Sequence, residues 1–303
     1  MTTLEDFLRP SQEKLFKKLC KRFKGNTLIN KGNFILVKGV APVMLVAHLD
    51  TVHQQQVRQI CAADNGNILS SPQVIGGDDR CGCYALVKVY NLSTAKPWLL
   101  FTCNEEIGGL GANFFCLSHA QGLLPNELDT LKFIVEIDRR GNNDAVFYDC
   151  YNPNFEAYIS SKGFQTAFGS FSDISLIAPE LGIAAVNLSA GYHNPHRLNE
   201  YIVRSELEHT IEKVVEIVAD SNSDNFPRYE YDTAFSFDYD DYFSWQDEGI
   251  IIPADLPKEY HDIYPELLEV YSVEQLEEIR LKYGNHILYR LYFDEFSSYY
   301  FDR

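Results

Sequence analysis

Apolar and polar residues follow two different periods along the first two thirds of the chain. A helical spacing over residues 15–23 predicts an opening helix on the apolar positions Leu15, Phe16, Leu19, Cys20 and Phe23. Short apolar runs predict strands at residues 33–38 and 43–48. A further run at residues 57–62 is joined through Asp64, Asn65 and Gly66 to residues 67–70, which predicts a hairpin.

Strand-like and helix-like segments then alternate. Helices are predicted at residues 80–92, 109–118 and 154–162, and strands at 98–103, 131–137, 145–150 and 183–188, with a Gly/Ser-rich loop before the last of these. A long amphipathic helix follows, predicted by the apolar stripe Ile202, Leu207, Ile211, Val214, Val215 and Val218. This alternation predicts an α/β fold, a three-layer α/β/α domain around a mostly parallel mixed sheet.

Composition changes near Ser221. Residues 221–303 carry 19 Asp and Glu against 6 Lys and Arg, and 12 of the 19 tyrosines. The stretch at residues 239–243 is too aromatic for a simple acidic disordered tail. One or two helices are predicted there by Leu267, Leu268, Val270, Leu276 and Ile279. We therefore expect a main domain at residues 1–220 and a small folded C-terminal appendage at 221–303.

The net charge and the cysteines indicate which partners and which cellular compartment to expect. A formal net charge of -17 repels nucleic-acid phosphates and anionic lipid, so neither is an expected partner. The seven cysteines are odd in number, scattered through apolar runs and free of CxxC pairs, which favours reduced thiols. No apolar signal core lies in residues 1–10 and no run reaches transmembrane length. We predict a cytoplasmic protein.

Five polar motifs each follow a predicted strand, where ligand sites form in open α/β sheets. They contain His48 and Asp50, Asp78 and Asp79, Glu105 and Glu106, Asp138, and finally His193, His196 and Glu200. Most have an ordinary alternative. His48 could be a surface histidine, Asp78 and Asp79 a helix cap, Asp138 an ion-pair partner of Arg139 or Arg140, and the loop histidines merely solvated.

One of these motifs favours a functional interpretation, and a second permits one. Adjacent glutamates directly after an apolar strand are costly unless a cation receives them, so Glu105 and Glu106 predict one metal ligand and one free general base. The glycines before Asp78 permit close approach of the chain, and a carboxylate can bridge two cations. Taken together, the imidazoles and carboxylates form a nitrogen and oxygen ligand set that zinc accepts.

The runs AHLDTV, GGDDRCG, NEEIGGLGA, EID and HNPHRLNEYI resemble the superfamily of co-catalytic di-zinc exopeptidases, over about residues 10–220. The resemblance implies a hydrolase with two divalent metal ions, most simply zinc. Asp78 would bridge them, with His48 and Asp138 on one ion and Glu106 and His196 on the other. Glu105 would be the general base, and Asp50 would orient His48. A cis peptide bond after Asp78 is also implied.

The chain departs from that resemblance in two places. Many relatives insert a lid or dimerisation domain between the fourth and fifth motifs, but only 58 positions separate Asp138 from His196. Substrate contacts made by the lid must then come from elsewhere. The acidic appendage matches nothing in the family, and it could cover the cleft or mediate oligomerisation. His196, four residues before Glu200, fits the family spacing better than His193, which stays open.

The expected substrate is a small peptide or an acyl-amino acid. An aminopeptidase-like activity is favoured because the domain is compact, and an N-acyl amino-acid deacylase is the alternative. A non-catalytic metal-binding or assembly module on the same fold is the hypothesis from another class. Retention of all five ligands and of Glu105 argues against that module.

Overall fold

The computed structural model describes residues 3–29, 32–53, 55–169 and 171–232, together with 256, 264, 267, 271, 275–277, 279, 280 and 288. The chain divides into two compact units, Met1–Ala234 and Phe235–Arg303. This division lies beyond residue 220, where composition changes, because the segment after the last helix runs back along the first unit. There the Tyr229 N–H donates to the Lys132 carbonyl and the Tyr231 N–H to the Gly182 carbonyl.

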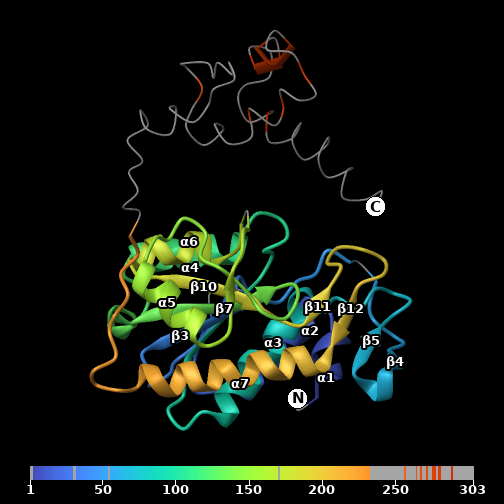
Figure 1. The fold of residues 1–303 in the computed structure, drawn as a ribbon, viewed down its shortest axis with the longest axis horizontal. Coiled ribbons are helices and arrows are strands. Elements are labelled where there is room, and N and C mark those ends of the chain that lie inside the picture. Colours follow the sequence, from blue (N-terminus) through green and yellow to red (C-terminus); the bar gives the residue numbers. More distant parts are fainter. Residues whose placement is uncertain are drawn as a thin grey trace. The chain divides into compact units, whose positions relative to one another are not determined.

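An eight-stranded sheet forms the centre of the first unit, in the order β1-β2-β6-β3-β7-β10-β8-β9 (Figure 1). Its strands are β1 Thr27–Ile29, β2 Phe34–Val37, β3 Val43–His48, β6 Trp98–Thr102, β7 Phe133–Arg139, β8 Asp144–Val146, β9 Gln165–Thr166 and β10 Ala185–Ser189. The four central strands, β6, β3, β7 and β10, are mutually parallel. Strands β2 and β8 join them in antiparallel pairing. The predicted mixed sheet is confirmed.

Helices cover both faces of this sheet. They are α1 Glu5–Leu8, α2 Gln12–Arg22, α3 Gly77–Leu92, α4 Leu110–Ala120, α5 Pro153–Ser161, α6 Ile174–Leu181 and α7 Arg204–Ser221. Alternate residues of a strand face opposite ways. Accordingly, Val43 and Leu45 of β3 pack in one apolar cluster with α2, α3, α5 and α7. Met44 and Val46 pack in a second cluster with α4 and α6. The three-layer α/β/α prediction is therefore confirmed.

A second sheet, β11-β12-β5-β4, lies beside the first. It comprises β4 Cys61–Ala63, β5 Ile68–Ser70, β11 Tyr192–His193 and β12 Tyr201–Val203. The predicted hairpin is present as β4 and β5, joined by a short 3-10 turn at Asp64–Gly66. Its first strand is shorter than predicted. Ile202 belongs to β12 rather than to the last helix, where the stripe had placed it, because it is buried in register with Leu69 of β5.

The prediction of a loop before β10 is wrong in part, because α6 occupies residues 174–181 of that segment. Ile174, Ile177 and Ala178 are buried at helical spacing against β7 and β10. A second short 3-10 turn, Asn126–Thr130, precedes β7. None of the helices in the described part of the chain is both long and apolar enough to cross a membrane.

The C-terminal unit is described at few positions. Three of the predicted helical residues, Leu267, Leu276 and Ile279, are helical. The other two, Leu268 and Val270, and the aromatic stretch at 239–243 lie outside the described residues. The role of this unit stays a prediction.

Candidate metal centre

Polar side chains meet at the carboxyl ends of the central parallel strands. They are His48 at the end of β3, Glu105 and Glu106 after β6, Asp138 in β7, Asp78 at the start of α3 and His196 in the loop between β11 and β12. Parallel neighbours present their carboxyl ends at one edge, which brings these distant segments together. Figure 1 shows β3, β7, α3 and the β11–β12 hairpin converging on this region.

Three of these residues form one group of candidate ligands. His48 Nε2 lies 3.2 Å from Asp78 Oδ1 and 3.6 Å from Asp138 Oδ1. The histidine is buried within the layer, whereas both carboxylates border a cavity of about 190 Å³. One imidazole nitrogen and two carboxylate oxygens at this spacing match the donor types that zinc accepts.

A second group shares Asp78 with the first. His196 Nε2 lies 3.2 Å from Asp78 Oδ2 and 3.2 Å from Glu106 Oε2. In each group the potential ligand atoms all lie within 4.8 Å of one another. The two oxygens of Asp78 thus face different histidines, which is the arrangement that a bridging carboxylate requires. All five residues predicted as metal ligands converge here.

Glu105 borders the same cavity as the candidate ligands. Its Oε2 lies 3.9 Å from His48 Nε2, farther than the carboxylates of Asp78 and Asp138. A further combination, His48 with Glu105 and Glu106, also satisfies the spacing for a cation. Glu105 therefore lies beside the atoms that would hold a cation.

Asp50 connects His48 to the two glutamates. Its Oδ1 lies 3.4 Å from His48 Nδ1, on the side of the ring opposite Asp78. Its two oxygens also accept hydrogen bonds of 3.1 Å from the backbone N–H groups of Glu105 and Glu106. A carboxylate in this position fixes the orientation of a ligating imidazole and keeps Nε2 free for a metal.

Glu200 holds the loop that presents Asp78. This buried carboxylate accepts hydrogen bonds from the Gly76 and Asp78 N–H groups, at 3.0 and 3.1 Å. The peptide bond from Asp78 to Asp79 is cis, as the resemblance implied. A Cβ on Gly77 would lie 2.7 Å from Tyr192 Cβ, so only glycine permits this close approach. Sequence reasoning used Glu200 only as a spacing marker and missed this contact.

Three more residues hold the ligands, and sequence reasoning assigned this role to none of them. Asn187 of β10 accepts from the Asp138 N–H at 2.8 Å and donates to the Asp138 carbonyl at 3.1 Å. The Tyr192 hydroxyl donates to Asp138 Oδ1 at 3.1 Å. Asp79 is fully buried and accepts from the His48 N–H at 3.2 Å and the Gly82 N–H at 2.9 Å.

The concentration of acids perturbs their ionisation. Burial raises the pKa of Glu105 to about 9, and the charge of Asp138 adds to the rise. Burial and the neighbouring Asp78 raise the pKa of Asp138 to about 7. Contacts with Asp78 and Glu106 raise the pKa of His196 to about 11. For Asp78, contacts with His196 and His48 outweigh burial and lower the pKa.

These residues fit a pair of divalent cations. Glu106 Oε1 is buried without a hydrogen-bond partner among the described residues, and a cation would satisfy it. Four carboxylates, those of Asp78, Glu105, Glu106 and Asp138, line one small cavity with two histidines beside them. Like charges packed this closely destabilise each other unless positive charge intervenes. The donor atoms and the concentration of negative charge therefore fit the two-metal site that the sequence predicts.

His193, the alternative last ligand, points elsewhere. Its Nε2 lies 2.6 Å from Glu206 Oε2, and its ring stacks on Tyr201 at a centroid distance of 4.8 Å. It belongs to none of the candidate ligand groups in the described part of the chain. The geometry favours His196.

Comparison with solved structures identifies proteins of similar fold. No protein-family model and no curated protein sequence matches the chain. The crystal structure of aminopeptidase PepT from Bacillus cereus aligns with a TM-score of 0.55 and 14% identity, covering 73% of this chain and 97% of that one. A tripeptidase from Staphylococcus aureus gives 0.53 and 15%, over 73% and 97%. An aminopeptidase from the archaeon Desulfurococcus kamchatkensis gives 0.52 and 13%, over 71% and 93%.

The fold is thus the one found in these two aminopeptidases and this tripeptidase. At these identities the likeness concerns the fold. The activity has to be argued from the side chains.

Proposed function

We propose that this chain is a zinc-dependent hydrolase that removes the N-terminal residue of small peptides. The observation that carries the proposal is the pair of ligand groups that share Asp78, with Glu105 on the wall of the same cavity. The residues of the two ligand groups are ones that the sequence motifs had singled out. Aminopeptidases and a tripeptidase of the same fold support a peptide substrate over an acyl-amino acid.

When bound, a pair of zinc ions would polarise the substrate carbonyl and acidify water at neutral pH. Glu105 would accept the proton of the attacking water and pass it to the leaving nitrogen. Asp50 would hold His48 through Nδ1, and Glu200 would hold the backbone that presents Asp78. Arg139, Tyr148 and Phe171 also line the cavity, where they would contact the N-terminal residue of the substrate.

Metal analysis and a substrate screen test the proposal. We expect about two zinc equivalents per chain that a chelator removes, as the two ligand groups require. Aminoacyl-, acyl- and dipeptide substrates, each with zinc, cobalt or manganese, separate an aminopeptidase from a deacylase. A protein without bound metal, or one that binds metal and cleaves none of them, would instead be the non-catalytic module.

Substitution of Glu105 tests the assignment of the base. Glu105→Gln keeps the size of the side chain but removes its capacity to take a proton, and we expect it to retain metal and lose about 10²- to 10⁴-fold in kcat. Glu127→Gln, at an exposed residue paired with Lys38, is the control. A fully active Glu105→Gln variant would eliminate this assignment.

We further propose that the C-terminal unit mediates assembly. A structure of similar fold, PhTET1-12s, is described as a dodecamer, with a TM-score of 0.51 and 14% identity over 71% of this chain and 97% of that one. Light scattering of the full chain measures its oligomeric state, and a strictly monomeric protein would contradict the proposal.

A further inference from the structure

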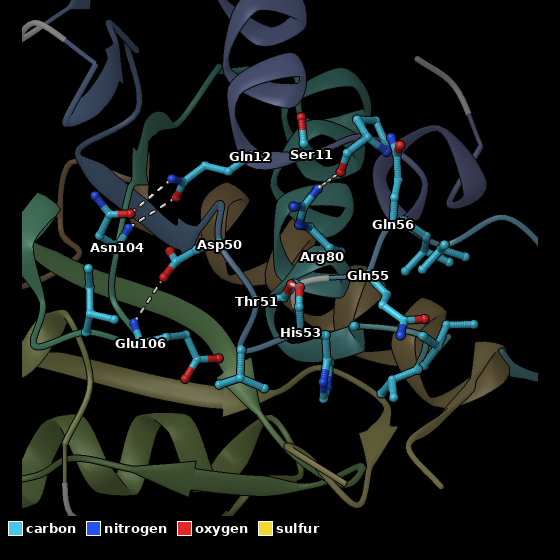
Figure 2. Close-up of a pocket in the computed structure, with 18 residues that line it drawn as sticks. Ser11, Gln12, Asp50, Thr51, His53, Gln55, Gln56, Arg80, Asn104 and Glu106 are labelled. Carbon is cyan, nitrogen blue, oxygen red and sulfur yellow. Dashed lines mark hydrogen bonds between the residues drawn. The ribbon is translucent and has the colours of Figure 1, made fainter. Parts of the chain in front are cut away.

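A second and larger cavity adjoins the metal centre. It measures about 470 Å³ and shares Glu106 with the cavity of the metal centre (Figure 2). Its wall is built by the end of α1, the start of α2, the loop after β3 and the turn before α3. Polar lining residues include Gln12, His53, Gln56 and Asn104. None of these four residues is a candidate ligand of the metal centre.

Arg80 is the unusual residue of this cavity. It lies in the first turn of α3 and is only 4% exposed, yet it lines the cavity. One terminal nitrogen donates to the carbonyls of Phe7 and Pro10, at 3.0 and 2.9 Å. Its Nε has no hydrogen-bond partner among the described residues, and no carboxylate lies within ion-pair distance there. A buried guanidinium is costly without an anion to pair with.

The acids beside this cavity already have partners. Both oxygens of Asp50 accept backbone hydrogen bonds, and the oxygen that accepts from the Glu105 N–H also faces His48. Figure 2 shows the hydrogen bond from the Glu106 N–H. Glu106 Oε2 faces His196 in the candidate metal centre. Gln12 and Asn104 bond to each other twice, at 3.0 and 3.2 Å. Asp50 and Asp79 act on Arg80 electrostatically, but in the described part of the chain no carboxylate bonds to its guanidinium, so this charge has no direct anionic partner.

We propose that Arg80 binds the free carboxylate at the C-terminal end of a short peptide substrate. This inference rests on the proposed aminopeptidase function and specifies its substrate. Glu106 borders both cavities, so a peptide whose scissile bond lies at the metal centre can extend its leaving part into the Arg80 cavity. A planar guanidinium with unused donors matches a carboxylate.

The structural alternative is that Arg80 only ties the N-terminal segment to α3. Two substrates separate these roles: a tripeptide with a free carboxylate and the same tripeptide as its C-terminal amide. On the wild-type protein we expect kcat/KM to favour the free acid by about 10- to 100-fold, as for the loss of one charged hydrogen-bond pair. An acidic protein would otherwise favour the more positive amide.

Arg80→Gln should bring the ratio of the two kcat/KM values towards one, and Arg80→Lys should keep part of it. Both substrates are measured on the same preparation, so partial unfolding lowers both rates and leaves the ratio unchanged. Arg58→Gln, at an exposed arginine that does not line the cavity, is the matched control and should keep the wild-type ratio.

A binding measurement gives a second readout that needs no catalysis. Calorimetry compares glycylglycine with glycylglycinamide on the wild-type and Arg80→Gln proteins, with and without added zinc. A preference for glycylglycine that the substitution abolishes supports the carboxylate site. Equal rates for acid and amide, together with equal binding, would overturn the Arg80 inference and leave the proposed hydrolase intact. Absence of hydrolysis with every metal would overturn the hydrolase, and binding would still decide on Arg80.

Discussion

The metal centre and the Arg80 cavity are neighbours with opposite deficits of charge. In the first, four carboxylates and His196 line about 190 Å³ of space with His48 buried beside them, and Glu106 has an oxygen without a partner among the described residues. In the second, about 470 Å³ of space adjoins a buried guanidinium whose Nε has no partner among the described residues. Burial makes each unmatched charge costly, so each cavity specifies the sign of its ligand.

This difference in charge explains how acidic residues of the metal centre can also line the Arg80 cavity. Asp50 and Glu106 belong to the metal side by their contacts, although they also line the Arg80 cavity. Both carboxylates bond within the metal side, so Arg80 is the charged group of the second cavity that has no direct anionic partner among the described residues. A peptide substrate would need cations at its scissile carbonyl and a cation at its terminal carboxylate, and these are the roles that the two proposals assign to the metal centre and to Arg80.

Asp78→Asn should have the largest effect, because Asp78 is the residue that the two ligand groups share. We expect both zinc ions to be lost, with affinity lowered by more than the roughly 10- to 100-fold seen for residues that only orient a ligand. Activity should fall to background, whereas binding of glycylglycine at Arg80 should persist. Zinc content by atomic absorption and calorimetry measure the two effects, and Asp64→Asn at an exposed turn is the control. Retention of two zinc ions would contradict the bridging role.

Glu200→Gln should have the next largest effect. Glu200 contacts the Asp78 loop through two backbone N–H groups and lies 3.5 Å from His53 of the Arg80 cavity. Glutamine offers a single acceptor oxygen, so one N–H loses its partner. We expect zinc affinity to fall by about 10- to 100-fold, with the ratio of acid to amide hydrolysis unchanged. Chelator competition measures the affinity. Glu212→Gln on the exposed side of α7 should leave it unchanged.

The pH dependence of stability should reflect the buried acids on the side of the metal centre. The pKa values of Asp173, Asp138 and Glu105 are raised by burial to about 6, 7 and 9. Folding therefore favours their protonated forms. The stability that these groups contribute is complete below pH 4 and is lost as pH rises through 6 to 9.

We thus expect metal-free protein to melt at a lower temperature at pH 9 than at pH 6, by about 2–4 °C for each kcal/mol lost. Added zinc should reduce the difference because it stabilises the ionised carboxylates. Calorimetric scans at both pH values, with and without zinc, measure it. Equal melting temperatures without metal would show that the acids are not stabilised by protons in the folded protein.

Local sequence was enough to predict the central sheet and its edge of ligands. Val43–His48 ends in a histidine, and Asp138 is the last residue but one of Phe133–Arg139, so parallel pairing brings these two side chains to the same edge. The helix α6 was missed because Pro179 and the neighbouring small polar residues are typical of a loop, while its buried face depends on β7 and β10.

Contacts between distant segments could not be predicted in the same way. Glu200 accepts from Asp78 across 122 positions, and Arg80 donates to Pro10 across 70. Nothing in the local pattern around Glu200 or Arg80 indicates which backbone groups will reach them. Ile202 illustrates the same limit, because its helical spacing with Leu207 was overridden by pairing with Leu69. Motif order predicts the ligands, whereas tertiary packing determines what holds them and what lies beside them.

The smallest effect is expected for His193→Asn, compared with His196→Asn on the same loop. His193 contacts Glu206 and Tyr201 at a partly exposed position, and such a pair contributes about 0–1 kcal/mol. His196 Nε2 instead lies 3.2 Å from two carboxylate oxygens of one ligand group. We expect His193→Asn to keep about two zinc ions and His196→Asn to keep about one, as measured by zinc content after dialysis. The reverse pattern would mean that the loop rearranges when metal binds and that His193 is the ligand.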